Sequence, residues 1–235
     1  QAITRGDGKV GEDVSLNVRT IKNVPLSLRK SEKYHKLLVG RTEIRGEIVM
    51  YKQDFIIVNS KRREAGEPEF MNPRNLSAGT IRQLDPKLVS ERPLHFVAYD
   101  MLRENQDDVP SYEFAYQAMR DLGISANNHA KVLIDIKNLM DYINFWQIER
   151  EDLAFNTDGL VIKINNRSDY VNLGVVGKTP RGAVAFKYPA EEATTVVKDI
   201  VISIGRTGAA TPVAVFDPVV VAGTTVQHAS LHNAD

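Results

Sequence analysis

The sequence predicts an α+β fold with antiparallel sheets, followed by an incomplete β-barrel. Two observations predict it. Up to about residue 193, segments with helical periodicity alternate with short strand-like runs; beyond that point only strand-like runs separated by Gly and Pro remain. The 235 residues, 43% of them hydrophobic, are enough for one domain and part of a second. We therefore predict one domain over residues 1–193 and the beginning of another over residues 194–235.

The first residues predict a turn and then a helix. "RGDGKVG" (residues 5–11) has the composition of a turn, and "GEDVSLNVRTI" (11–21) has the periodicity of a helix with Glu12 and Asp13 in its first turn. The glycines also match the G-x-G-x-x-G pattern of dinucleotide-binding loops. We reject that interpretation, because these carboxylates and Asp7 in the loop would repel a pyrophosphate.

Strands and helices alternate in the middle of the chain. "RTEIRGEIVM" (41–50) alternates strictly, which predicts a strand with one charged face, and a second strand is predicted over 94–102. The charged face consists of Glu43, Arg45 and Glu47. Helices are predicted over 54–66, 111–123 and 135–150, and another is predicted to begin near Pro73 and to end before Pro86. In the last helix, a buried stripe is predicted at Ile136, Leu139, Met140, Ile143 and Trp146, which indicates core packing and not a cofactor site.

Two later strands each contain a lysine. "NTDGLVIKIN" (156–165) carries Lys163, and "GAVAFKYPAEE" (182–192) carries Lys187 just before a proline. Each lysine shares its face of the strand with small or apolar residues. One interpretation is a cation kept clear for a ligand, and the other is a solvated strand residue; for either strand alone we weigh the two equally.

The composition excludes several classes of protein and site. Thirty basic and thirty acidic residues give a neutral chain, so any surface that binds nucleic acid must be local. There are no cysteines, which excludes disulfides and Cys-ligated zinc within these residues, and the five histidines lack metalloprotease spacing. No signal peptide or run of about 20 apolar residues is present, so we expect a cytosolic protein without a membrane partner.

Taken together, the charged residues predict a site for a phosphorylated ligand and a metal ion. Lys163 and Lys187 are joined by Arg74 and Arg82 from the "NPRNLSAGTIRQLDP" segment. Cations neutralise phosphoryl oxygens while a carboxylate holds Mg²⁺. Tyr99 in "HFVAYDML" would stack on a base, although a core aromatic is a strong alternative.

Six segments resemble the NAD⁺-dependent bacterial DNA ligases in the same order along the chain. They are "TRGDGKVGEDVSLNVRTI", "EIRGEIVM", "NPRNLSAGTIRQLDP", "TDGLVIKIN", "PRGAVAFKYPAEE" and "IGRTGAATPVAVFDPVVVAGTTVQHASLHNAD". The resemblance extends over essentially the whole chain. It implies an adenylation domain of the nucleotidyltransferase fold, followed by the beginning of an OB-fold. It further implies the bacterial cytoplasm, association with the nucleoid, and a monomer.

The resemblance also implies an activity and roles for single residues. Such ligases attack the α-phosphate of NAD⁺ with a lysine, transfer the AMP to the 5′-phosphate of nicked double-stranded DNA, and seal the strand. Lys163 and Lys187 would stabilise charge at the α-phosphate, with Mg²⁺ or Mn²⁺ as the metal. The other implied contacts are Arg5, Arg74 and Arg82 with phosphates of the nucleotide and DNA, Glu47 with adenosine and the metal, Tyr99 with adenine, and Arg206 with nicked DNA.

The chain departs from the family in one respect that matters for catalysis. The nucleophile of the family lies in a K-x-D-G motif just before the segment that matches "TRGDG", and no K-x-D-G occurs in these residues. We therefore expect a piece of a longer ligase that is inactive by itself. The zinc, helix-hairpin-helix and BRCT modules would also lie outside it, so zinc would belong only to those absent parts.

Other interpretations remain open. The main alternative is a non-catalytic nucleotide- or nick-binding protein that has lost the lysine. A relative of ATP-dependent ligases or capping enzymes is a third interpretation, which the "NPRNLSAGTIRQLDP" segment disfavours. A purely structural module is the weakest, because it would not need so many cations on strands of small residues.

Overall fold

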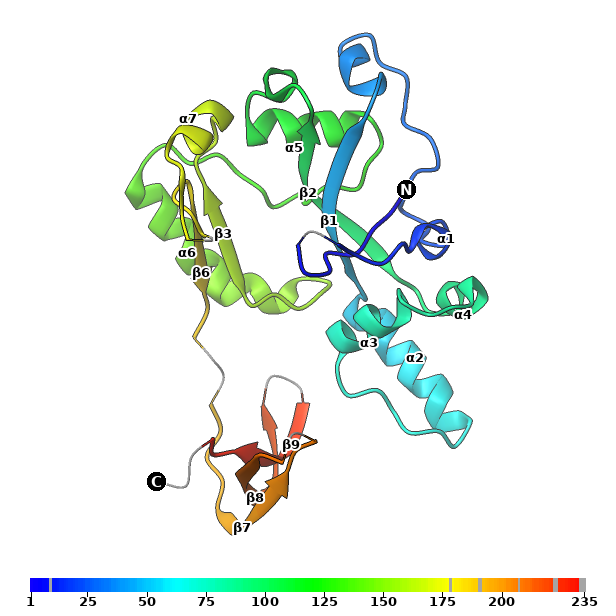
Figure 1. Ribbon diagram of the computed structural model, residues 1–235, viewed down its shortest axis with the longest axis vertical. Helices are drawn as coiled ribbons and strands as arrows, with labels where there is room; N and C mark the ends of the chain where they lie inside the picture. Colours follow the sequence, from blue (N-terminus) through cyan, green and yellow to red (C-terminus); the bar gives the residue numbers. More distant parts are fainter. Residues whose placement is uncertain (9, 178, 190–191, 207, 222–223, 233–235) are drawn as a thin grey trace. The chain divides into compact units, whose positions relative to one another are not determined.

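The computed structural model describes residues 1–8, 10–177, 179–189, 192–206, 208–221 and 224–232 (Figure 1). They form two compact units. The first consists of Gln1–Glu69 and Pro73–Tyr188, and the second of Phe70–Asn72 and Pro189–Asp235. The predicted α+β class is confirmed, since helices accompany sheets whose strand pairs are all antiparallel. The domain boundary after residue 193 stays a prediction.

Most elements of the first unit lie where they were predicted, but the helix that begins at Pro73 ends early, at Thr80, and Pro86 begins a separate helix. Its strands are β1 (Thr42–Val49), β2 (His95–Arg103), β3 (Gly159–Lys163), β4 (Val175–Val176), β5 (Thr179–Pro180) and β6 (Ala183–Lys187). Its α-helices are α1 (Ser15–Val18), α2 (Lys52–Glu64), α3 (Pro73–Thr80), α4 (Pro86–Ser90), α5 (Tyr112–Asp121), α6 (Ile136–Glu149) and α7 (Arg167–Asn172). Short 3₁₀ turns cover His35–Leu38, Gln106–Asp108 and Arg150–Asp152. None of the described helices is long and apolar enough to cross a membrane.

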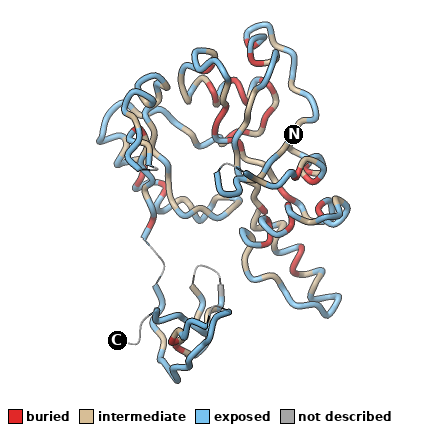
Figure 2. Tube along the Cα trace, in the orientation of Figure 1, coloured by how far each residue is buried: buried red, intermediate tan, exposed pale blue. Residues whose placement is uncertain are grey.

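The core of the first unit lies where α5 packs on β2 (Figures 1 and 2). The β1 and β2 strands pair antiparallel, and β2 supplies Ala98 and Met101, both fully buried. Helix α5 contributes Ala115, Ala118 and Met119, at the spacing that puts residues on one helix face. This packing fixes the position of β2 and therefore also the positions of Tyr99 and Asp100, which lie between Ala98 and Met101.

A second sheet carries the two lysines. Strands β3 and β6 pair antiparallel, with Gly159 opposite Lys187 and Lys163 opposite Ala183. A Cβ atom on Gly159 would lie 2.1 Å from the carbonyl oxygen of Phe186, so only glycine allows the two backbones to approach this closely. The helix that follows β3, α7, begins with the side chain of Asn166 accepting a hydrogen bond from the backbone N–H of Asp169.

The second unit is a three-stranded antiparallel meander. It is formed by β7 (Val197–Ile204), β8 (Ala210–Val221) and β9 (Thr224–Ser230), in the order β7-β8-β9. Ala214 and Pro212 on β8 are buried, whereas every residue of β7 is exposed. The strands of the described residues thus form an open sheet and not a closed barrel.

The first helix is shorter than predicted. Glu12 and Asp13 lie outside α1, because this segment is extended and pairs with the N-terminal residues. The backbone N–H of Thr4 donates to the carbonyl of Glu12 at 2.9 Å, and that of Val14 donates to Ala2 at 2.9 Å. Pairing with the N-terminal residues therefore overrides the local helical pattern.

The predicted stripe on α6 is only partly buried. Ile143 and Trp146 are buried, but Ile136 is 74% exposed and Met140 is 47% exposed. Trp146 makes edge-to-face contacts with His129 and Phe145. Helical spacing correctly marked the apolar face of α6, but only its second half has a packing partner among the described residues.

Candidate functional site

The β3–β6 sheet presents both lysines on the same face. In the antiparallel register, Lys163 and Ala183 are opposite each other, as are Gly159 and Lys187. Residues directly opposite in a ladder share a face, as do residues two apart along a strand. Both lysines therefore lie on one face, separated by four residues of strand, or about 13 Å. Each faces a small residue across the ladder, which leaves room above the sheet.

Lys163 lies against two tyrosine rings. Its Nζ is 4.6 Å from the ring centre of Tyr112 and 5.7 Å from that of Tyr99, distances at which an ammonium is attracted to a ring face. Burial is the main cause that lowers the pKa of Lys163, and the charges of Arg167 and Arg45 lower it further. Because a partly buried ammonium is less screened by water, its attraction to an added anion such as a phosphate is stronger than at an exposed site.

Tyr99 lies on a bulge of β2. The pairing of β1 with β2 skips this residue, so its side chain leaves the regular alternation. Tyr99 is 40% exposed, which argues against the alternative of a core aromatic. Burial and the charge of Glu47 raise the pKa of Tyr99, while Arg45 and Arg5 oppose the rise. The charges of Arg5 and Glu47 therefore act at this ring.

Four predicted residues thus belong to one neighbourhood around Tyr99. Glu47 comes from β1, Tyr99 from β2 and Lys163 from β3, whereas Arg5 comes from the turn before the first helix. That turn is closed by a hydrogen bond from the N–H of Gly8 to the carbonyl of Arg5 at 3.0 Å. An aromatic face with two cations and one carboxylate suits an aromatic base attached to a phosphate.

Lys187 belongs to a second group, which it shares with Asp158 and Arg74. Its Nζ donates to Oδ2 of Asp158 at 2.6 Å, and the Nη1 of Arg74 lies 3.9 Å from the same oxygen. This hydrogen bond is the main cause that lowers the pKa of Asp158. Lys187 therefore has a carboxylate partner within the protein, and its availability to a ligand stays a prediction. The pair is about two-thirds exposed on both sides, so a competing anion can reach it.

The two remaining predicted residues are Arg82 and Arg206. Arg82, which follows α3, has its Nε 3.8 Å from Oε2 of Glu12 in an exposed ion pair. Arg206 belongs to the second unit and occupies the turn between β7 and β8. Backbone hydrogen bonds close that turn, from Gly205 to Ala209 and from Gly208 to Gly205, both at 2.9 Å. These backbone hydrogen bonds stabilise the turn without the side chain of Arg206.

Three charged residues of the site were missed from the sequence. Asp158 was interpreted only as part of a turn, although it directly precedes the Lys163 strand. Asp100 is 7% exposed. A carboxylate in an apolar strand indicates a buried charge with a partner, and this was the signal in the sequence. Arg167 pairs with Asp100, but nothing in its local sequence indicated this contact.

The described residues contain no cluster of three or more His, Cys, Asp or Glu side chains that would hold a metal ion by themselves. This donor set does not suit zinc or calcium, which take most of their ligands from the protein. Mg²⁺ needs only one or two carboxylates when phosphate and water supply its other ligands. Glu47 is exposed and could supply one oxygen of that kind.

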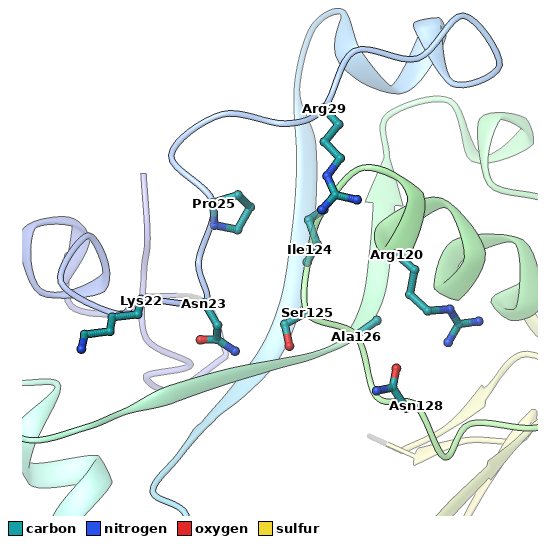
Figure 3. Close-up of a pocket in the computed structure, with 10 residues that line it drawn as sticks. Lys22, Asn23, Pro25, Arg29, Arg120, Ile124, Ser125, Ala126 and Asn128 are labelled. Carbon is teal, nitrogen blue, oxygen red and sulfur yellow. The ribbon is translucent and has the colours of Figure 1, made fainter.

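A pocket of about 430 Å³ lies elsewhere on the first unit (Figure 3). Its walls come from the loop that carries Lys22 and Arg29, from Arg120 near the end of α5, and from the segment that follows. None of the predicted site residues lines it. Arg120 is in the last turn of α5, where a cation complements the negative end of the helix dipole. We therefore place the candidate site at the lysine sheet and not at this pocket.

Comparison with known proteins gives a consistent result over the whole chain. Residues 1–191 match the NAD-dependent DNA ligase adenylation domain, and residues 194–235 match the NAD-dependent DNA ligase OB-fold domain. Similar curated proteins include the DNA ligases of Halothermothrix orenii (46% identical, 99% of this chain, 33% of the relative), Oceanobacillus iheyensis (43%, 99% and 34%) and Heliobacterium modesticaldum (44%, 100% and 34%). The chain spans about a third of the length of these relatives.

Proposed function

The chain belongs to the NAD-dependent DNA ligase family, and on that premise we propose that it is the adenylation domain and part of the OB-fold of an enzyme that seals nicked double-stranded DNA with AMP taken from NAD⁺. The observation that carries the proposal is the placement of two lysines on one face of the β3–β6 sheet, with Lys163 beside the exposed ring of Tyr99.

The chemistry of AMP transfer explains why this face needs cations. A lysine amine attacks the α-phosphorus, a P–N bond forms, the P–O bond to nicotinamide mononucleotide breaks, and the amine loses a proton. Negative charge on the phosphoryl oxygens must be stabilised in the transition state. Lys163 and Lys187 supply fixed positive charge there. The nucleophile is a third lysine, since the 235 residues contain no K-x-D-G motif.

The other residues bind and orient the nucleotide. The adenine stacks on Tyr99, and Glu47 contacts the adenosine. Arg5, Arg74 and Arg82 bind phosphate groups, and the last two also face the DNA. When bound, Mg²⁺ or Mn²⁺ would supply further charge stabilisation at the phosphates, with Glu47 as its protein ligand. We also propose that the enzyme works as a monomer in the bacterial cytoplasm, at the nucleoid.

The proposal is tested in the complete protein that contains this chain. Incubated with NAD⁺, Mg²⁺ and a nicked duplex, it is expected to yield the sealed strand and nicotinamide mononucleotide. Sealing with ATP and not with NAD⁺ would contradict the proposed AMP donor. Binding of NAD⁺ or of the nick without any sealing would instead support the alternative of a non-catalytic binding protein.

The isolated 235-residue chain is expected to form no covalent AMP adduct. In the proposed mechanism Lys163 and Lys187 stabilise charge and do not attack the phosphate, and the motif that carries the nucleophile is absent from the sequence. The measurement is intact-mass spectrometry after incubation with NAD⁺ and Mg²⁺. A stoichiometric gain of one AMP would show that a lysine within the chain is the nucleophile, and the role of Lys163 would have to be revised.

Arg206→Ala, in the complete protein, is expected to weaken binding to nicked DNA and to reduce the slope of log K against log salt by about one unit. The reason is the loss of one phosphate contact from an exposed turn. Adenylation by NAD⁺ should not change, because Arg206 lies in the second unit and the lysine sheet lies in the first. The control is Arg206→Lys, which keeps the charge and should keep the slope. An unchanged slope with a lower melting temperature would make Arg206 a structural residue of its turn.

A further inference from the structure

A buried ion pair lies under the Lys163 site. The carboxylate of Asp100 accepts a hydrogen bond from Nη2 of Arg167, and the same Oδ1 accepts the backbone N–H of Met101 at 2.8 Å. The two side chains are only 10% and 12% exposed. They come from β2 and from the first residue of α7, so the pair joins the core sheet to the segment that follows the Lys163 strand.

The arginine of this pair also holds an aromatic ring. The guanidinium carbon of Arg167 is 4.4 Å from the ring centre of Tyr112, and the Nζ of Lys163 is 4.6 Å from the same centre. Tyr170, three residues further along α7, packs edge-to-face against Tyr112 at 5.7 Å. One ring is thus in contact with the ion pair through Arg167 and with the candidate catalytic cation directly.

The charges around Lys163 are unevenly distributed. Arg45 on β1 and Arg167 on α7 both disfavour its ammonium form, whereas Asp100 on β2 favours it. The tyrosines of β2 and α5 contribute ring faces, and β6 contributes the side chain of Ala183 across the ladder. Asp100 is therefore the ion-pair partner of Arg167 and also favours the charged form of Lys163.

We propose that Asp100 and Arg167 are positioning residues, which hold Tyr112 against Lys163 and set where the ammonium of Lys163 lies. The inference deepens the proposed function and rests on it for the role of Lys163 in AMP transfer. If Arg167 is removed, Asp100 loses its partner and attracts the ammonium of Lys163. The ammonium then moves toward the Asp100 carboxylate and away from the phosphate. If Asp100 is neutralised, Arg167 and Lys163 repel each other without compensation.

The alternative is that the pair only anchors α7. Buried ion pairs do not by themselves indicate function, and breaking one is destabilising in any protein. The chain offers a matched control in Arg103 and Asp108, whose side chains are 12% and 11% exposed and lie 3.4 Å apart in the same unit. A structural role predicts that Arg103→Leu and Arg167→Leu have the same consequences.

The test measures Lys163 directly and needs no ligase activity. Lysines of the chain are reductively methylated with ¹³C, and the Lys163 signal is assigned by its loss in Lys163→Arg. Arg167→Leu removes a positive charge and is expected to raise the pKa of Lys163 by about one unit, whereas Asp100→Asn is expected to lower it. Arg103→Leu should leave it unchanged. Equal pKa values in wild type, Arg167→Leu and Asp100→Asn would overturn the inference.

Two additions keep the outcome interpretable. If Asp100→Asn does not fold, Arg167→Lys is used instead, because it keeps the charge but loses the planar contact with Tyr112. The pKa of Lys163 should then be unchanged, whereas the methyl signal of Lys163 should lose its ring-current shift from Tyr112. An unmoved signal counts against positioning. Addition of AMP tests the proposed function separately. If AMP does not change the Lys163 signal but the variants still shift the pKa of Lys163 as expected, the nucleotide site is refuted and the positioning role is supported.

Discussion

Lys187→Ala is expected to slow lysine adenylation about 10²–10³-fold in the complete protein, because it removes a preorganised cation from the transferring phosphoryl group. The fold should survive the change. The Lys187–Asp158 pair is about two-thirds exposed, and exposed pairs contribute little to stability. The loss should therefore appear in the single-turnover rate with NAD⁺ and not in the melting temperature. The pKa of Asp158 should rise towards its ordinary value, since Lys187 is its main depressing partner.

A second exposed pair provides the control for this prediction. Lys198 contacts Asp217 in the second unit, with 59% and 58% of the two side chains exposed. Lys198→Ala removes an equivalent surface ion pair that belongs to the second unit and not to the lysine sheet, and it should leave adenylation unchanged. Near-normal adenylation in Lys187→Ala would mean that Lys187 is a solvated strand residue, the alternative that its sequence left open. An equal loss in both variants would indicate a general effect of charge.

Gly159→Ala is expected to destabilise the first unit by about 3 kcal/mol, the upper part of the usual range for overpacking. The added methyl group would lie 2.1 Å from the carbonyl oxygen of Phe186, and a backbone atom cannot move aside by changing rotamer. The β3–β6 ladder must separate to accommodate it. Denaturant unfolding followed by the fluorescence of Trp146, the only tryptophan of the chain, reports on this unit.

The matched glycine variant is Gly79→Ala on α3. A Cβ atom added to Gly79 would meet no other atom within 4 Å, and alanine is favoured over glycine in helices. The substitution is expected to leave stability unchanged or to raise it by up to about 1 kcal/mol. A Gly159→Ala protein as stable as wild type would show that the two strands are not as closely paired as described.

Local patterns predicted the secondary structure well where local energetics decide it. The helix predicted over 54–66 is present from Lys52 to Glu64 and ends before Gly66, whose φ of 71° suits a left-handed position. The exceptions arise from distant partners. Residues 12–14 lie in an extended pairing with the first residues, and only half of the apolar face of α6 is covered. Neither partner can be recognised in a window of ten residues.

The sequence by itself determined the family, and it predicted which residues carry positive charge to a phosphate. Alternation placed Lys163 and Lys187 each on a face of its own strand, because side-chain direction in a strand has a period of two. Whether the two faces coincide depends on the register between β3 and β6, and only the tertiary structure decided that. It also decided that Lys187 has Asp158 as a partner, that Tyr112 lies against Lys163, and that Asp100 pairs with Arg167. Such contacts join residues tens of positions apart, and no local propensity specifies them because packing and charge compensation act through space.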